Sequence, residues 1–153
     1  MDKAEKERRK EDFDAWITFI PDEVIELKKM FPTSLSGKFD YSETSLDFIE
    51  QYLLQNYSSE NFLGEENKIL LDRLARYVGS TFRRNLPNAY WDIELDDTMD
   101  VFFTLPVVKV KDAQLAPFSP HTLITTLLAR KRGNFLSTIL ENTKKTLEKI
   151  KTQ

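Results

Sequence analysis

The sequence predicts an α+β domain in which about six helices surround a small antiparallel sheet of two to four strands. Two observations carry this prediction. Between residues 65 and 85, apolar side chains recur every three or four positions, as on one face of a helix. From Tyr90 to Asp96, apolar and polar residues alternate, as in a strand with one buried face. At 153 residues the chain is long enough to bury a core, and we expect one domain spanning residues 1–153.

The N-terminal part of the chain predicts two helices in close succession. Residues 2–12 hold five basic and five acidic side chains, so the charges cancel, and the segment is expected to be the solvated, frayed start of a helix. An apolar helical stripe follows it: Phe13, Trp16, Ile17 and Ile20. Pro21 fits the first position of a second helix, which Pro32 ends.

A third helix and the long central helix come next. Ser42 is typical of an N-cap and predicts a helix from residue 43 to about residue 55. Two polar segments flank this helix and are predicted to be irregular: 33–38 and 56–64. Gly79 interrupts the apolar stripe of the central helix, where a glycine costs about 1 kcal/mol relative to alanine. We therefore expect another backbone, that of the sheet, to approach Gly79 closely.

The strands follow the central helix, and Pro87 prevents that helix from continuing. The alternating strand at 90–96 leads into a polar turn. Two further β-prone runs, 101–105 and 107–110, come after the turn. Pro106 divides these runs, so we expect a bulge, a break or a sheet edge there.

Two more helices are predicted at the C-terminal end. Ser119 and Pro120 are typical of a hydroxyl cap followed by the first residue of a helix. This helix is expected to end at residues 130–132, with Gly133 in the left-handed conformation that terminates it. Asn134 is expected to cap the last helix, which continues to about residue 150.

Composition limits the classes of function. The net charge is -3 and the pI about 5.3, so nothing in the overall charge favours nucleic acid or an anionic membrane as a partner. The absence of cysteine excludes disulfides and thiolate chemistry. No signal peptide is recognisable, and no apolar run approaches the roughly 18 residues of a membrane span. We therefore expect a cytoplasmic protein without a membrane partner.

Several short motifs together resemble a family of small uncharacterised bacterial α+β proteins. The residues that carry the resemblance are Asp40-Tyr41-Ser42 with Ser45-Leu46, Ala75 to Ser80, Trp91, and Pro117 to Pro120. The pattern consists of a capped helix, a helix with a Tyr-aliphatic-Gly motif, a Trp strand and a Pro-rich loop. Ser80 stands where the pattern often has an acidic residue. The resemblance implies the α+β fold and no established activity.

Three groups of polar residues could carry chemistry, and each also has a structural explanation. The densest acidic cluster is Asp92, Glu94, Asp96, Asp97 and Asp100. Such oxygen-rich runs can hold a divalent cation, but the spacing is not that of an EF-hand, and a solvated strand face explains it better. The single histidine, His121, is expected on the surface in the first turn of a helix. The basic runs at 83–84, 130–132 and 144–145 could bind phosphate, but they also lie where helix dipoles favour cations.

The sequence favours a non-enzymatic, cytosolic partner-binding protein, of the kind that neutralises another bacterial protein. Its candidate interaction surface is Tyr90, Asp92, Glu94, Phe102 and Phe103, an aromatic patch edged by acids that suits a basic partner or self-association. We expect no catalytic residue, no cofactor and no metal. The alternatives are a metal-assisted hydrolase that uses the 92–100 carboxylates, and a phosphate or nucleic acid binder that uses the basic helix ends.

Overall fold

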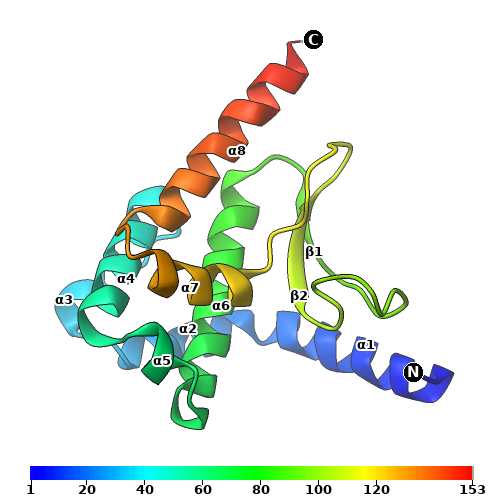
Figure 1. Cartoon of the computed structure of the whole chain (residues 1–153), viewed down its shortest axis with the longest axis horizontal. Coiled ribbons are helices and arrows are strands. Elements are labelled where there is room, and N and C mark those ends of the chain that lie inside the picture. The colour runs from blue at the N-terminus through cyan, green and yellow to red at the C-terminus, as the bar shows by residue number, and fades with distance from the viewer. Residues whose placement is uncertain (153) are drawn as a thin grey trace.

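The computed structural model describes residues 1–152 and confirms the α+β class (Figure 1). Eight α-helices, one 3-10 helix and one two-stranded antiparallel sheet occur in this range. Their bounds are α1 Lys3–Thr18, α2 Ile20–Lys29, α3 Thr33–Ser36, α4 Glu43–Asn56, α5 Ser59–Phe62, η1 Glu65–Asn67, α6 Lys68–Asn85, β1 Ala89–Ile93, β2 Pro106–Val110, α7 Pro120–Arg130 and α8 Phe135–Lys151. No helix within residues 1–152 combines the length and apolar character that a membrane crossing requires.

Helix α6 runs through the middle of the molecule and packs against α2, α7 and both strands (Figure 1). Its apolar stripe faces this surrounding shell, and Leu74, Tyr77 and Val78 are fully buried. Gly79 faces β1, as expected, but the close neighbour is a side chain rather than a backbone. A Cβ at Gly79 would lie 2.1 Å from Cη2 of Trp91 and 2.8 Å from Cγ of Pro120. Glycine therefore makes room for the Trp91 indole.

Helix α1 is continuous almost from the N-terminus, because Asp2 caps it by accepting from the backbone N–H of Glu5 at 2.8 Å. Most of this helix is solvated, and its inner end packs beside the sheet. There the indoles of Trp16 and Trp91 meet edge to face, with ring centroids 5.1 Å apart. Phe19 separates α1 from α2, so Pro21 is the second residue of α2 rather than its first.

The two segments predicted to be irregular each contain one turn of helix. Helix α3 lies within 33–38, and α5 lies within 56–64. Ser58 and Asn61 form a reciprocal capping box around α5. This box directs Phe62 into the core, where it is 1% exposed. The prediction of a polar linker at 56–64 was therefore wrong, because one aromatic residue anchors the segment.

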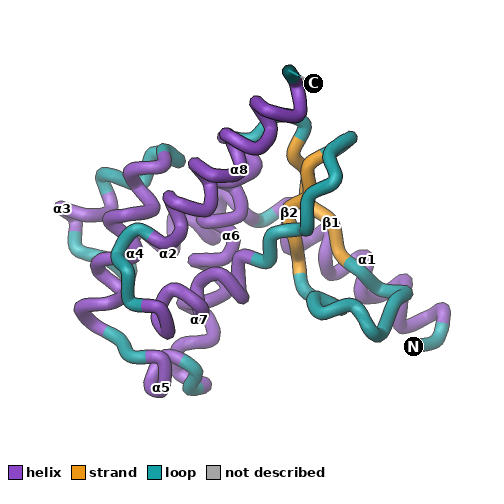
Figure 2. The backbone as a smooth tube through the Cα atoms, turned by 45° about the horizontal axis from the view of Figure 1, so that its top comes forward, coloured by secondary structure: helices purple, strands orange, loops and turns teal. Residues whose placement is uncertain are grey.

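The sheet consists of β1 and β2 in antiparallel register, with Trp91 opposite Val108 (Figure 2). Phe118 forms an isolated bridge to Val108 on the outer side of β2. Strand β2 begins at Pro106, the position where a strand tolerates proline. The run 101–105, predicted as a strand, is a series of turns instead. The backbone N–H groups of residues 102–105 bond to nearby carboxylates and carbonyls instead of forming a ladder.

Helix α7 starts as predicted, with the Ser119 hydroxyl accepting from the backbone N–H of Thr122 at 3.3 Å. The helix ends at Arg130, within the predicted range, and Gly133 has a positive φ of 90°, but Lys131 is the left-handed residue that directly follows the helix. Helix α8 also differs, since no side-chain bond of Asn134 caps it. The fully buried Glu50 of α4 instead accepts from the first two N–H groups of α8, at 2.8 and 2.9 Å.

Candidate functional site

The loop that joins β1 to β2, residues 94–105, holds most of the acidic cluster, and its carboxylates fold it. Glu94 Oε2 accepts from the backbone N–H groups of Asp96 and Asp97, at 2.9 and 3.1 Å. The N–H of Thr104 donates to the Glu94 carbonyl at 2.9 Å and closes the loop. Carboxylates that accept from nearby backbone N–H groups stabilise turns. These acids therefore have a structural task within the 94–105 loop.

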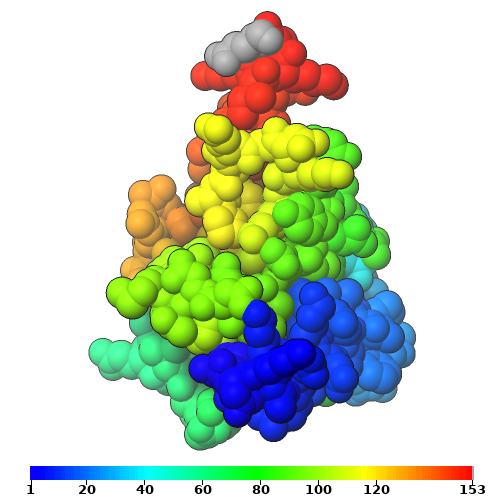
Figure 3. All heavy atoms as spheres, turned by 90° about the vertical axis from the view of Figure 1, so that its right-hand side faces the viewer, coloured from blue at the N-terminus to red at the C-terminus, as the bar shows by residue number. Residues whose placement is uncertain are grey.

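The tip of the 94–105 loop presents two large apolar side chains to solvent. Met99 is 88% exposed and Val101 is 82% exposed. Asp97 accepts from the Met99 N–H at 2.9 Å, and Asp100 accepts from the Phe102 N–H at 2.8 Å. Figure 3 shows this segment, in yellow-green, standing out from the surface beside α1 in blue. The loop is thus an acidic projection with an apolar tip, braced by its own hydrogen bonds.

The sequence predicted an interaction surface of five residues: Tyr90, Asp92, Glu94, Phe102 and Phe103. The structure leaves Tyr90 43% exposed on β1, opposite Lys109 on β2. Asp92 accepts from Lys109 Nζ at 2.7 Å, and this hydrogen bond raises the pKa of Lys109. Phe102 and Phe103 are half-buried in the 94–105 loop. Because residues 101–105 form no strand, the pairing that was expected to bring one of these rings beside Tyr90 does not exist.

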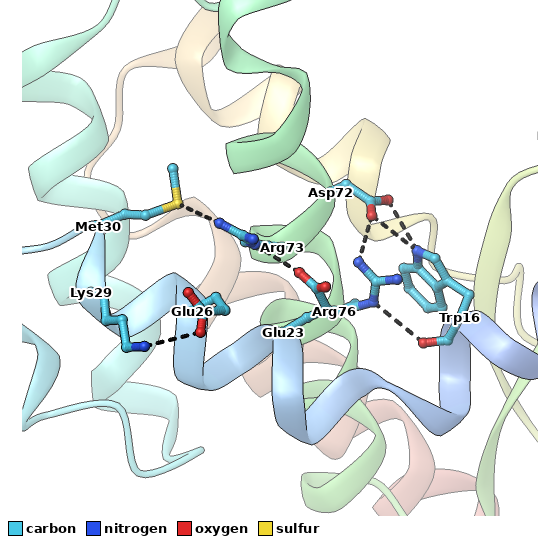
Figure 4. Close-up of polar contacts among 8 residues, drawn as sticks. All are labelled: Trp16, Glu23, Glu26, Lys29, Met30, Asp72, Arg73 and Arg76. Atoms are coloured by element: carbon cyan, nitrogen blue, oxygen red, sulfur yellow. Dashed lines mark hydrogen bonds and ion pairs between the residues drawn. The ribbon is translucent and has the colours of Figure 1, made fainter.

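His121 was expected on the surface, but its side chain is only 16% exposed and forms part of a cluster. Its Nε2 lies 3.0 Å from Oδ1 of Asp72 on α6. The same carboxylate accepts from Trp16 Nε1 at 3.0 Å and from Arg76 Nη1 at 2.5 Å (Figure 4). One acid therefore joins α1, α6 and α7.

The environment of Asp72 favours its ionised form. Burial alone would raise the pKa of this carboxyl, but hydrogen bonds from His121 and Trp16 and the charge of Arg76 outweigh burial. The pKa of Asp72 is therefore lowered from its ordinary value. The cluster is a charge-assisted network, in which the bonds to an ionised acceptor are stronger than those between neutral groups.

A cavity of about 300 Å³ lies beside this cluster, between α1, α6 and the sheet. Arg9 and Asp12 line it together with Asp72 and His121. Catalysis by His121 would require a ring nitrogen open to a ligand. Nε2 is engaged by Asp72, and Nδ1 is buried and has no hydrogen-bond partner among residues 1–152. The arrangement therefore favours a structural junction over an acid–base pair.

The three basic runs take part in contacts within the chain. The guanidinium of Arg84 lies 3.6 Å from the ring centroid of Tyr41. Lys144 pairs with Glu43 at 2.5 Å, and Lys145 lies 3.9 Å from Glu141. These runs come from the end of α6, the end of α7 and the middle of α8. The positions of these basic side chains are therefore explained by their location at helix ends and on a helix surface.

No group of three or more His, Cys, Asp or Glu side chains that could hold a metal ion occurs in residues 1–152. No such cluster in these residues supports the alternative of a metal-assisted hydrolase. Comparison with family models, with curated proteins and with solved structures finds no match to this chain. The resemblance to a bacterial family therefore stays a prediction.

Proposed function

We propose that the chain is a non-enzymatic, cytosolic partner-binding protein that docks a basic surface of another protein through the 94–105 loop. The observation that carries this proposal is the tip of that loop, where Met99 and Val101 are both more than four-fifths exposed. Burying an apolar side chain of this size is worth about 1.5–3 kcal/mol. Two such residues side by side can therefore act as the anchors of an interface.

The loop needs little reorganisation to bind. The hydrogen bonds from Met99 and Phe102 to Asp97 and Asp100 already hold the tip in one conformation. Association costs free energy chiefly where side chains and loops must be ordered, so a preformed loop lowers that cost.

Charge defines the partner. Asp97 is exposed beside the apolar tip, Asp96 is exposed in an ion pair with Lys6, and the whole chain carries a net charge of -3. Complementary charge raises association rates and excludes like-charged partners. A basic partner therefore fits best, and a protein that covers the basic working surface of another protein neutralises it. We infer this inhibitory role as the form that the binding takes.

The test compares three proteins: the wild type, the double variant Met99→Ser with Val101→Ser, and a control variant Leu63→Ser. Leu63 is also strongly exposed, at 66%, but lies outside the loop. Each protein is immobilised and exposed to lysate of the source organism, and any protein retained by the wild type is purified and titrated by calorimetry. We expect a basic partner whose affinity falls with added salt and at least tenfold in the double variant, because each anchor contributes more than about 1 kcal/mol.

The control should bind the purified partner as the wild type does. The proposal fails if the double variant binds equally well, if the partner is acidic, or if the wild type retains nothing that the double variant does not.

A further inference from the structure

Strand β1 has an open edge. The sheet contains only β1 and β2 within residues 1–152, and β2 is additionally bridged by Phe118. Val108 exchanges two backbone hydrogen bonds with Phe118, at 2.8 and 2.9 Å. No corresponding segment within the described part of the chain pairs with the other side of β1.

The register identifies the backbone groups at this edge. Opposing residues of an antiparallel pair alternate between exchanging hydrogen bonds and turning their groups outward. The N–H of Lys111 donates to the Asn88 carbonyl, and that of Thr104 donates to the Glu94 carbonyl, so even-numbered residues face β2. Trp91 and Ile93 therefore turn their N–H and C=O groups outward. Neither residue makes another backbone hydrogen bond in residues 1–152.

Two cavities lie along the open edge of β1. One of about 540 Å³ lies between α1 and β1, and one of about 340 Å³ lies toward the start of α2 and the end of α6. Both are lined by Ile17 and Trp91, so the two cavities are neighbours, and we call them together the trough. The larger cavity touches Trp91, Asp92 and Ile93. Because successive residues of a strand point to opposite faces, a cavity that touches all three lies at the edge.

The trough combines an apolar floor with charged walls. Phe13, Ile17 and Leu95 contribute to the floor. Its acids Asp92 and Asp96 are already paired with Lys109 and Lys6. The charged lining residues that form no ion pair in residues 1–152 are Lys3, Lys10, Arg83 and Arg84, against Glu7 and Asp14. In the larger cavity Lys3 and Lys10 balance Glu7 and Asp14, so the excess of positive charge lies in the smaller cavity, where Arg83 and Arg84 have no acid among the lining residues.

We propose that the trough binds an extended, acidic and apolar peptide segment of a partner protein, which adds to the edge of β1 as a further strand. The peptide backbone pairs with the free groups of Trp91 and Ile93, and its alternate apolar side chains enter the floor. Its acidic side chains face the unpaired cations of the walls. The Lys6–Asp96 ion pair at one end is exposed, and such pairs open at little cost.

This site shares Leu95 and Asp96 with the base of the 94–105 loop but does not include its tip at Met99 and Val101, so its test can fail independently of the test of the proposed function. Twelve-residue peptides are selected from a random display library on the wild-type protein. The selected peptides are then synthesised, labelled and titrated by fluorescence anisotropy. Ile93→Pro removes an outward N–H at a position where an edge strand tolerates proline, and Ile93→Val keeps that N–H.

We expect acidic peptides with alternating apolar residues, bound at least tenfold more weakly by Ile93→Pro than by Ile93→Val. The melting temperatures of these two variants should be similar. Methylating alternate peptide nitrogens should weaken binding to the same extent, and Met99→Ser with Val101→Ser should leave binding unchanged.

Four results overturn the proposal: no peptide is selected, the selected peptides are basic, N-methylation has no effect, or Ile93→Pro binds as Ile93→Val does. A wild-type dimer that Ile93→Pro disperses also overturns it, because a second copy of this chain would then cover the edge.

Discussion

Gly79→Ala tests the packing at the centre of the molecule. The new Cβ would lie 2.1 Å from Cη2 and 2.7 Å from Cζ2 of Trp91. Carbon atoms in contact are about 3.5–4.0 Å apart, so the indole must retreat by roughly 1.5 Å. The Trp16 ring stands edge to face against it, and the Pro120 ring closes another side. The added methyl group therefore has no vacant space to enter.

Two opposing contributions set the change in the free energy of unfolding that Gly79→Ala causes. Overpacking of this kind costs about 1–3 kcal/mol, whereas alanine gains about 1 kcal/mol over glycine inside a helix. Because the overlap involves two rings, we expect the upper half of the range and a net loss of about 1–2 kcal/mol. For a chain of this length that lowers the melting temperature by about 2–8 °C.

The assay is thermal and urea unfolding followed by circular dichroism. Gly37→Ala is the matched control, because a Cβ there meets only the Thr33 carbonyl oxygen, at 3.7 Å, and the residue has a helical φ of -65°. Gly37→Ala should be neutral or stabilising by up to about 1 kcal/mol. Adding Trp91→Phe to Gly79→Ala should cost less than the sum of the single changes, since the smaller ring frees space. An unchanged or raised melting temperature for Gly79→Ala, or strict additivity with Trp91→Phe, would refute the reasoning.

Two further variants test the buried polar contacts. Asp72→Asn should lower the free energy of unfolding near pH 6. Because the pKa of Asp72 is lowered, its contribution is present above the unfolded value of about 3.9 and is lost as pH falls through the folded value. The difference in unfolding free energy between wild type and Asp72→Asn should therefore narrow as the pH falls below about 3.9, and a constant difference would contradict this. Glu50→Ala should cost at least about 2 kcal/mol in the same assay, because two N–H groups at the start of α8 lose a charged acceptor. Asp47→Ala, which removes only the bond from the Ser137 hydroxyl, should cost less, and equal losses would argue against a capping role for Glu50.

Elements whose signals are local were predictable from the sequence. The caps at Ser42 and Ser119 depend on residues three positions away. The spacing of apolar residues changes after α6 from every three or four positions to every second position, which marks the first strand. The run 101–105 was misassigned because β propensity was weighed without Asp97 and Asp100, whose carboxylates turn the chain.

The contacts that define the candidate sites join distant parts of the chain. Asp72 and Arg76 are an i,i+4 pair that spacing could have revealed. His121 meets Asp72 across 49 positions, and Glu50 reaches the start of α8 across 85, so no local pattern indicates either contact. The exposed tip was not predicted, because Met99 was assigned to the polar turn after the first strand and Val101 to a β-prone run.

The placement of the two tryptophans has a practical consequence. Trp16 and Trp91 are the only two in the chain, and they meet where α1 packs beside the sheet. Intrinsic fluorescence of this protein therefore reports on that single joint rather than on the whole chain. The tryptophan emission maximum would shift to longer wavelength if α1 separated from β1, even if the helical circular dichroism in the far ultraviolet were unchanged. Trp91 also lines the trough, so binding of a peptide there should change the tryptophan emission spectrum without any attached dye.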